Sequence, residues 1–164
     1  EEKKSKTFTL LLSSPIHLKE IIIGKFIACM LVVTLMILLS SYSIVFLALI
    51  GQPEIGPVVS GYLGLLLMAG CYVSVGIFAS SLTDNQIIAA VIGFGFTLFM
   101  WVIGWGAQAA GPGMGELLKY LSLVDHLESF IKGIVDSSDV VFYLSFIALG
   151  LFLTHRVLDS NRWR

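Results

Sequence analysis

The chain has 164 residues, of which 57% are hydrophobic and only 13% are charged, and its formal net charge is −1. Soluble domains carry about 25% charged residues, so this composition excludes an ordinary soluble globular protein, a disordered tail and a disulfide scaffold. Cys29 and Cys71 both lie in apolar runs, which is typical of small buried hydrophobic residues rather than of a redox pair or metal site. The near-neutral charge gives no reason to expect nucleic acid as a partner.

The first 25 residues are polar or amphipathic. The chain begins at Glu1 without methionine or a signal-peptide pattern, so we expect it to start inside a larger protein. The apolar stretch at 7–12 is too short to cross a bilayer. Ser14 and Pro15 suit the cap and first turn of a following helix. The pattern predicts a short amphipathic helix, a break and a second interfacial helix, which act either as a surface anchor or as a docking helix for a cytoplasmic partner.

Four apolar runs follow, and a helix needs about 20 residues to cross a bilayer. The runs at 26–50, 58–82 and 87–107 contain no charged side chain, and the run at 140–154 is shorter. Polar ends of a longer helix around this last run can reach the interface. The runs lack both the alternation of barrel strands and the polar faces of soluble helices. We therefore predict an all-α membrane protein with four transmembrane helices.

The basic residues predict how these helices are oriented. Five lysines precede residue 26 and three arginines follow residue 154, so the side that holds both chain ends has eight basic residues and the other side has two. Cytoplasmic flanks are enriched in Lys and Arg. We therefore expect a multi-pass protein of the cytoplasmic (inner) membrane, with both ends of the chain and the 83–86 turn in the cytoplasm.

Small residues recur at four-residue spacing in the second run, a pattern that lets helices approach closely. We predict helix packing at Gly64, Gly70, Ser74, Gly76 and Ser80. The alternative is a polar lining for a substrate path or gate. The first three runs contain no ionisable Asp, Glu, Lys, Arg or His, which argues against a proton-coupled transporter.

The segment at 108–139 has a helical rhythm of apolar residues. It predicts one or two amphipathic helices in or at the outer interface. Asp125, His126 and Glu128 cluster there, but without a further paired His or Cys they indicate a solvated helix face rather than a metal site. We therefore expect no metal in this chain.

The chain also resembles a known family. The resemblance lies in the sequence from Glu1 to Pro15, followed by Ile21 and Gly24-Lys25-Phe26. This sequence resembles the signature of type-2 ABC transporter permeases, and most of all that of the gliding-motility and copper-site-maturation permeases. Their turn between two spans is similar to Ser80-Ser81-Leu82-Thr83-Asp84-Asn85-Gln86, and their outer amphipathic region is similar to Tyr120-Leu121-Ser122. Two positions depart from the signature, because Lys6 stands where glycine is usual and Thr9 where glutamate is usual.

The resemblance implies the last four of six permease spans, with the first two missing. It divides the chain into a cytoplasmic coupling-helix region at 1–25, three transmembrane helices at 26–107, an outer amphipathic segment at 108–139, and a last transmembrane helix with a cytoplasmic tail at 140–164. It also implies a dimer with a second permease copy or homologue in the lipid bilayer. The residues implied to dock on an ABC ATPase subunit are Lys6, Thr7, Leu10, Leu11, Leu12, Pro15 and Ile16.

Three functions compete at this level. The first is the permease subunit of an ATP-driven ABC transporter. Because no G-x-x-x-x-G-K-[ST] motif is present, ATP and Mg²⁺ would bind the partner ATPase, and we expect no cofactor in this chain. The second is an intramembrane enzyme, which needs paired catalytic side chains at membrane depth. His17, His126 and His155 lie outside the spans or at their edges, so we expect a non-catalytic subunit. The third is an ATP-independent channel or assembly protein, which the composition leaves open.

Overall fold

The computed structural model describes residues 18–51, 54–109, 111 and 113–162. Across these residues every regular element is an α-helix. In chain order the helices are α2 (Leu18–Ser40), α3 (Tyr42–Ile50), α4 (Ile55–Leu82), α5 (Gln86–Ala109), α6 (Met114–Leu121), α7 (Leu123–Ile131) and α8 (Ser137–Arg162).

Four segments are long and apolar enough to cross a membrane: Leu18–Ile44, Ile55–Leu82, Gln86–Gly106 and Ser137–Ser160. The prediction of an all-α membrane protein with four spanning helices is therefore confirmed. The first helix differs from its prediction, because α2 begins at Leu18 and runs without a break through Lys25. Leu18 and the isoleucines that follow are apolar enough to continue the span, and Lys25 can extend its charged end toward the interface.

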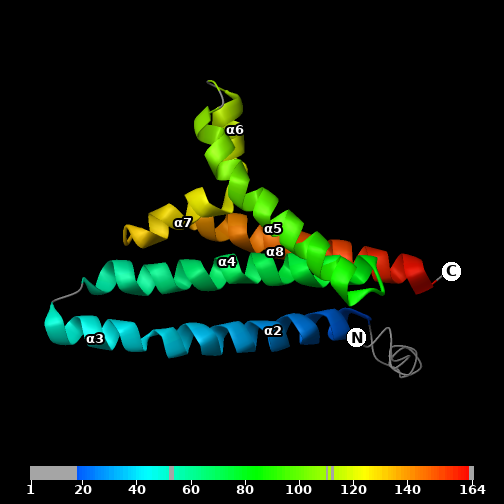
Figure 1. Ribbon diagram of the computed structural model, residues 1–164, viewed down its shortest axis with the longest axis horizontal. Coiled ribbons are helices and arrows are strands. Elements are labelled where there is room, and N and C mark those ends of the chain that lie inside the picture. Colours follow the sequence, from blue (N-terminus) through cyan, green and yellow to red (C-terminus); the bar gives the residue numbers. More distant parts are fainter. Residues whose placement is uncertain (1–17, 52–53, 110, 112, 163–164) are drawn as a thin grey trace.

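The long helices α2, α4 and α8 run side by side, and α5 leaves this bundle at an angle (Figure 1). The start of α2, the turn between α4 and α5, and the end of α8 meet at one end of the bundle, which we call the turn end. The basic residues predict that these three segments share one side of the membrane, and the bundle has the connectivity that this requires.

Helix α4 lies at the centre because its small residues admit close neighbours. A Cβ atom added at Gly64 would lie 2.8 Å from Phe130 Cβ of α7, and one added at Gly70 would lie 2.7 Å from Ile147 Cδ1 of α8. From the other side, a Cβ at Gly150 would lie 2.7 Å from Ser74 Oγ. Such approaches leave no room for a methyl group, so α7 and α8 pack almost directly on the α4 backbone.

Helices α6 and α7, residues 114–131, are together called the cap here; α6 packs mainly on α5, and α7 packs mainly on α4. A buried cluster of Cys71, Leu123, Phe130 and Tyr143 joins α7 to α4 and α8. Two side chains add hydrogen bonds to cap carbonyls: Tyr143 Oη donates to Leu123 O at 2.7 Å, and Ser60 Oγ donates to Phe130 O at 2.6 Å. Because buried carbonyls need partners, these bonds fix how α7 lies on the bundle.

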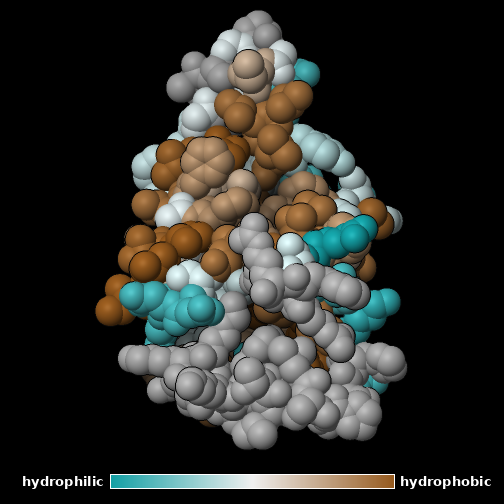
Figure 2. Space-filling view, turned by 90° about the vertical axis from the view of Figure 1, so that its right-hand side faces the viewer, coloured by the Kyte–Doolittle hydropathy of each residue, from teal (hydrophilic) through white to brown (hydrophobic). Residues whose placement is uncertain are grey.

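The surface of the spanning helices is strongly apolar. Leu31 and Leu39 of α2 are 65% and 67% exposed, and Phe94 of α5 is 70% exposed. Seen from the turn end, hydrophobic residues cover much of the upper part of the molecule, and hydrophilic patches lie lower down (Figure 2). An apolar surface of this extent is stable when it faces lipid.

Candidate functional site

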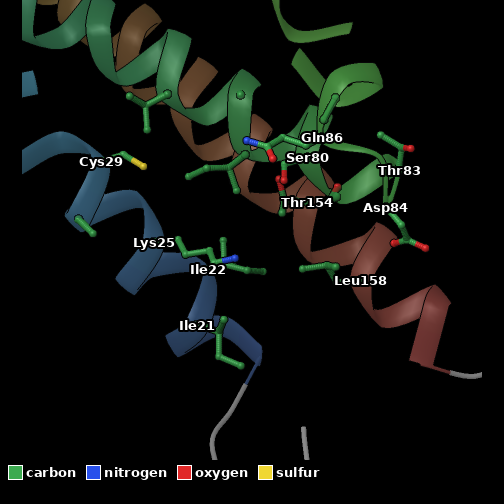
Figure 3. A pocket seen from close by; sticks show the side chains of 16 residues that line it. Ile21, Ile22, Lys25, Cys29, Ser80, Thr83, Asp84, Gln86, Thr154 and Leu158 are labelled. Carbon is green, nitrogen blue, oxygen red and sulfur yellow. The ribbon is translucent and has the colours of Figure 1, made fainter. Parts of the chain in front are cut away.

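A cavity of about 510 Å³ lies at the turn end of the bundle (Figure 3). Four helices and one turn contribute its walls: Ile21, Ile22, Lys25, Ala28 and Cys29 from α2; Val73, Gly76, Ile77, Ser80 and Ser81 from α4; Thr83 and Asp84 from the turn; Gln86 and Ala89 from α5; and Thr154 and Leu158 from α8. The cavity therefore lies among all four spanning helices.

The turn that closes one wall of the cavity is shaped by its own side chains. Asn85 caps α5, because its Oδ1 accepts a hydrogen bond from Ile87 N at 2.9 Å. Thr83 Oγ1 accepts from Asn85 N at 3.2 Å. These two bonds reverse the chain within a few residues and bring Asp84 and Gln86 to the cavity (Figure 3).

The cavity combines apolar walls with a few polar groups. Seven of its sixteen lining residues are isoleucine, alanine, valine or leucine. Lys25 and Asp84 are the charged residues among those that line it, and they come from opposite walls (Figure 3). In the described part of the chain no three His, Cys, Asp or Glu side chains cluster closely enough to hold a metal ion.

Helix α2 is attached to the rest of the bundle at few points. Ile22 is the buried residue of α2, at 4% exposed, and it lies in the cavity wall. Farther along, Met30 Sδ approaches the α4 backbone near Gly70. Most of the remaining α2 surface is exposed or half-buried, so this helix presents an apolar face to its surroundings along most of its length.

The small residues predicted to pack in α4 separate into two environments. Gly64 lies against α7, Gly70 against Ile147, and Ser74 against Gly150. Gly76 and Ser80 instead line the cavity, and a Cβ added at Gly76 would meet no atom within 4 Å. The residues predicted to dock on an ATPase lie in the segment 1–17, outside the described residues.

The cap holds a second polar site that the sequence interpretation missed. His126 is only 9% exposed and Asp139 only 8%. The prediction that His126 lies on a solvated helix face is therefore wrong, because His126 is buried and contacts Asp139 of α8. Glu128 does fit that prediction, because it is exposed. It accepts a hydrogen bond from Lys132 Nζ at 2.9 Å, and this contact lowers the pKa of Glu128.

His126 and Asp139 are brought together by the connection between α7 and α8. Gly133 adopts a φ of 85°, a left-handed conformation that favours glycine. Gly133 N donates to Phe130 O at 3.1 Å and Ile134 N to Ser129 O at 3.0 Å, the paired bonds that end many helices. The chain thus turns sharply from α7 into α8, and no spacing motif in the sequence marks the pair that results.

These features define a multi-pass, all-α membrane protein with a partly open cavity at the end where its first described helix begins. The family model for ABC-2 family transporter proteins matches residues 1–157, so the chain belongs to this family of membrane permeases. Comparisons with curated proteins and with solved structures give no match. The resemblance to type-2 ABC permeases that the sequence motifs indicated is therefore confirmed.

Proposed function

We propose that this chain is the non-catalytic membrane subunit of an ATP-driven transporter and that it moves substrate when a separate ABC ATPase subunit hydrolyses ATP. The family match over residues 1–157 carries this proposal. ATP and Mg²⁺ bind the ATPase, and a second permease copy or a homologue completes the membrane part. The exposed apolar faces of α2 and α5 are available for lipid and for that second copy.

The coupling pathway that we propose runs from the amphipathic segment into α2. The apolar residues at 10–12 insert into a groove on the ATPase, in the manner of other helix-in-groove contacts. This segment precedes α2 in the sequence, and α2 has Ile22 as its buried residue and forms one wall of the cavity. A push on the segment then tilts the first turns of α2 across the cavity, and the space at the turn end accommodates the motion.

The test of this pathway replaces two leucines with acids. Leu11→Asp combined with Leu12→Asp should weaken ATPase binding at least about a hundredfold, because each buried leucine contributes about 1.5–3 kcal/mol. Binding is measured by co-purification and titration of the ATPase with the full chain in nanodiscs, and turnover by substrate-dependent ATP hydrolysis.

The control for this test is Leu11→Met combined with Leu12→Met, which keeps the apolar volume and should bind the ATPase normally. Both variants should insert into the membrane fraction to the same extent. If the acidic variant keeps normal ATPase affinity and normal substrate-dependent turnover, the segment is only a surface anchor and the coupling pathway is wrong.

We also propose that the turn end faces the cytoplasm and the cap faces the opposite side of the inner membrane. The motivation is the excess of Lys and Arg in the sequence before residue 26 and after residue 154. Cys29→Ser leaves Cys71, which is buried. In this background, one cysteine introduced in place of Glu116 in the exposed part of α6 and one in place of Ser160 near the end of α8 should react differently in intact cells. A membrane-impermeant maleimide should label position 116 and spare 160. The reverse pattern would invert the proposed orientation.

A further inference from the structure

His126 joins three helices through its two ring nitrogens. Nδ1 lies 2.6 Å from Asp139 Oδ1 of α8, and Nε2 lies 2.9 Å from the backbone oxygen of Tyr120 in α6. The imidazole face stacks on Phe142, with ring centroids 4.0 Å apart and an interplanar angle of 23°. His126 and Asp139 are both more than nine-tenths buried, so water cannot readily replace either contact.

The two oxygen partners determine how many protons the site holds. A carbonyl oxygen only accepts, so Nε2 must carry the proton that is donated to Tyr120 O. A neutral imidazole would then present a bare lone pair from Nδ1 to Asp139 Oδ1. At 2.6 Å two lone pairs without a proton between them repel. One proton must therefore lie between Nδ1 and Oδ1, whether it resides on the nitrogen or on the carboxyl oxygen.

We propose that His126 and Asp139 form a proton-binding site that locks the cap to α8. The site contains one proton more than the sum of those on a neutral histidine and an ionised aspartate. In both arrangements of that proton the pair has no net charge, which suits a buried position. The site is independent of the proposed ATPase coupling, and its ligand is a proton taken from the aqueous side next to the cap.

The groups around the pair favour keeping the proton. On α7, Asp125 precedes His126, and its buried Oδ2 has no hydrogen-bond partner; Asp139 Oδ2 is in the same condition. Negative charge at both positions disfavours a pair that has lost its proton. Asp139 also lies in the first turn of α8, where the helix dipole stabilises a carboxylate, so within the pair the shared proton resides on Nδ1 rather than on Oδ1.

The remaining ionisable groups near the site do not supply this proton. Tyr143 of α8 uses its hydroxyl to donate to Leu123 O, and α4 contributes Cys71, whose Sγ lies 3.6 Å from Tyr143 O. The ring of Tyr120 in α6 meets His126 edge-on. The part of α5 around Gly104 carries no ionisable side chain in the sequence. On the outer face of α7, Glu128 is paired with Lys132.

The direction of the pH effect follows from the proton count. A free histidine releases its proton near about pH 6.5, so a detached cap holds one proton fewer than an attached cap above that pH. Raising the pH therefore favours detachment, and lowering it favours the locked cap. Loss of the proton costs one of the two contacts that hold His126 between α6 and α8.

Asp139→Asn provides a matched variant that removes the need for the proton. The amide of the introduced asparagine can donate to Nδ1 of a neutral His126, while Nε2 still donates to Tyr120 O. Both contacts persist, so the cap should stay attached at all tested pH values. Glu128→Gln is the control, because it neutralises another carboxylate of the cap without touching the pair.

The experiment measures hydrogen exchange of the cap amides in the full chain in nanodiscs between about pH 6 and pH 9. Rates are divided by the intrinsic rates at each pH to give protection factors. In the wild type and in Glu128→Gln, protection of the cap should fall by up to about tenfold per pH unit above about pH 6.5. In Asp139→Asn it should stay flat. Equal slopes in the wild type and in Asp139→Asn would overturn the proposal.

A second measurement keeps the proposal testable if Asp139→Asn does not fold. The side-chain nitrogens of ¹⁵N-histidine in the wild type report protonation directly, and the signals of His126 are those that His126→Gln removes. At about pH 7.5, above the range in which a free histidine is charged, Nε2 should carry a proton and Nδ1 should share one with Asp139. A bare Nδ1 with the shift of a neutral imidazole would show that the site holds no extra proton.

Discussion

Leucine in place of Gly64 should detach the cap from α4 and lower the thermal stability of the whole bundle. The added side chain begins 2.8 Å from Phe130 Cβ and Cγ, and Phe130 cannot turn away because its Cβ is fixed to the α7 backbone. Overpacking of this kind costs about 1–3 kcal/mol. The shift also threatens the hydrogen bond from Ser60 Oγ to Phe130 O. Thermal unfolding in detergent should show a clear fall in the midpoint.

The matched variant is Gly61→Leu, on the same helix. A Cβ at Gly61 meets no atom within 4 Å, and leucine is favoured over glycine in a helix by nearly 1 kcal/mol. Gly61→Leu should therefore be neutral or slightly stabilising. Equal unfolding midpoints for Gly64→Leu and the wild type would mean that α7 does not pack on this part of α4.

This pair of variants shows how far the sequence predicts the packing of α4. The small-residue spacing identified Gly64, Gly70 and Gly76 as equivalent, since each has a partner of similar size four residues away. The structure separates them, because Gly64 and Gly70 face α7 and α8 while Gly76 faces the cavity. Because the three glycines are six residues apart, helix geometry places them on three different sides of α4; spacing along one helix gives these directions, but which neighbour covers each side depends on the other helices.

The same reason explains why the spans were predicted and the polar pair was not. A run of apolar residues is a local property, and its length is compared directly with the thickness of a bilayer. The contact between His126 and Asp139 joins residues on two helices, and it depends on the turn at Gly133. In the sequence His126 follows Asp125 and precedes a mixture of apolar and polar residues. This pattern fits an exposed His126 on a helix surface as well as it fits a buried one. Tertiary packing decides between the two.

Leucine in place of Gly76 should block transport while leaving the protein folded. This prediction rests on the proposed movement of α2 across the cavity at the turn end. A Cβ at Gly76 meets no atom within 4 Å and Gly76 lines the cavity, so we expect the rest of the leucine side chain to extend into the cavity. The side chain then occupies the space into which the first turns of α2 would move. We expect the affinity for the ATPase to stay normal and substrate-dependent ATP turnover to fall at least about tenfold, which corresponds to about 1.4 kcal/mol in the barrier.

The measurement compares three forms of the full chain reconstituted with the ATPase: the wild type, Gly76→Leu and Gly61→Leu. Gly61→Leu adds the same side chain to the same helix but away from the cavity lining, so it should turn over normally. Thermal unfolding should give similar midpoints for all three, because neither added Cβ meets an atom within 4 Å. A folded Gly76→Leu variant with wild-type turnover would show that the cavity takes no part in the motion. A large fall in its midpoint would show instead that α2 and α4 already pack too closely there for the cavity to serve as space for movement.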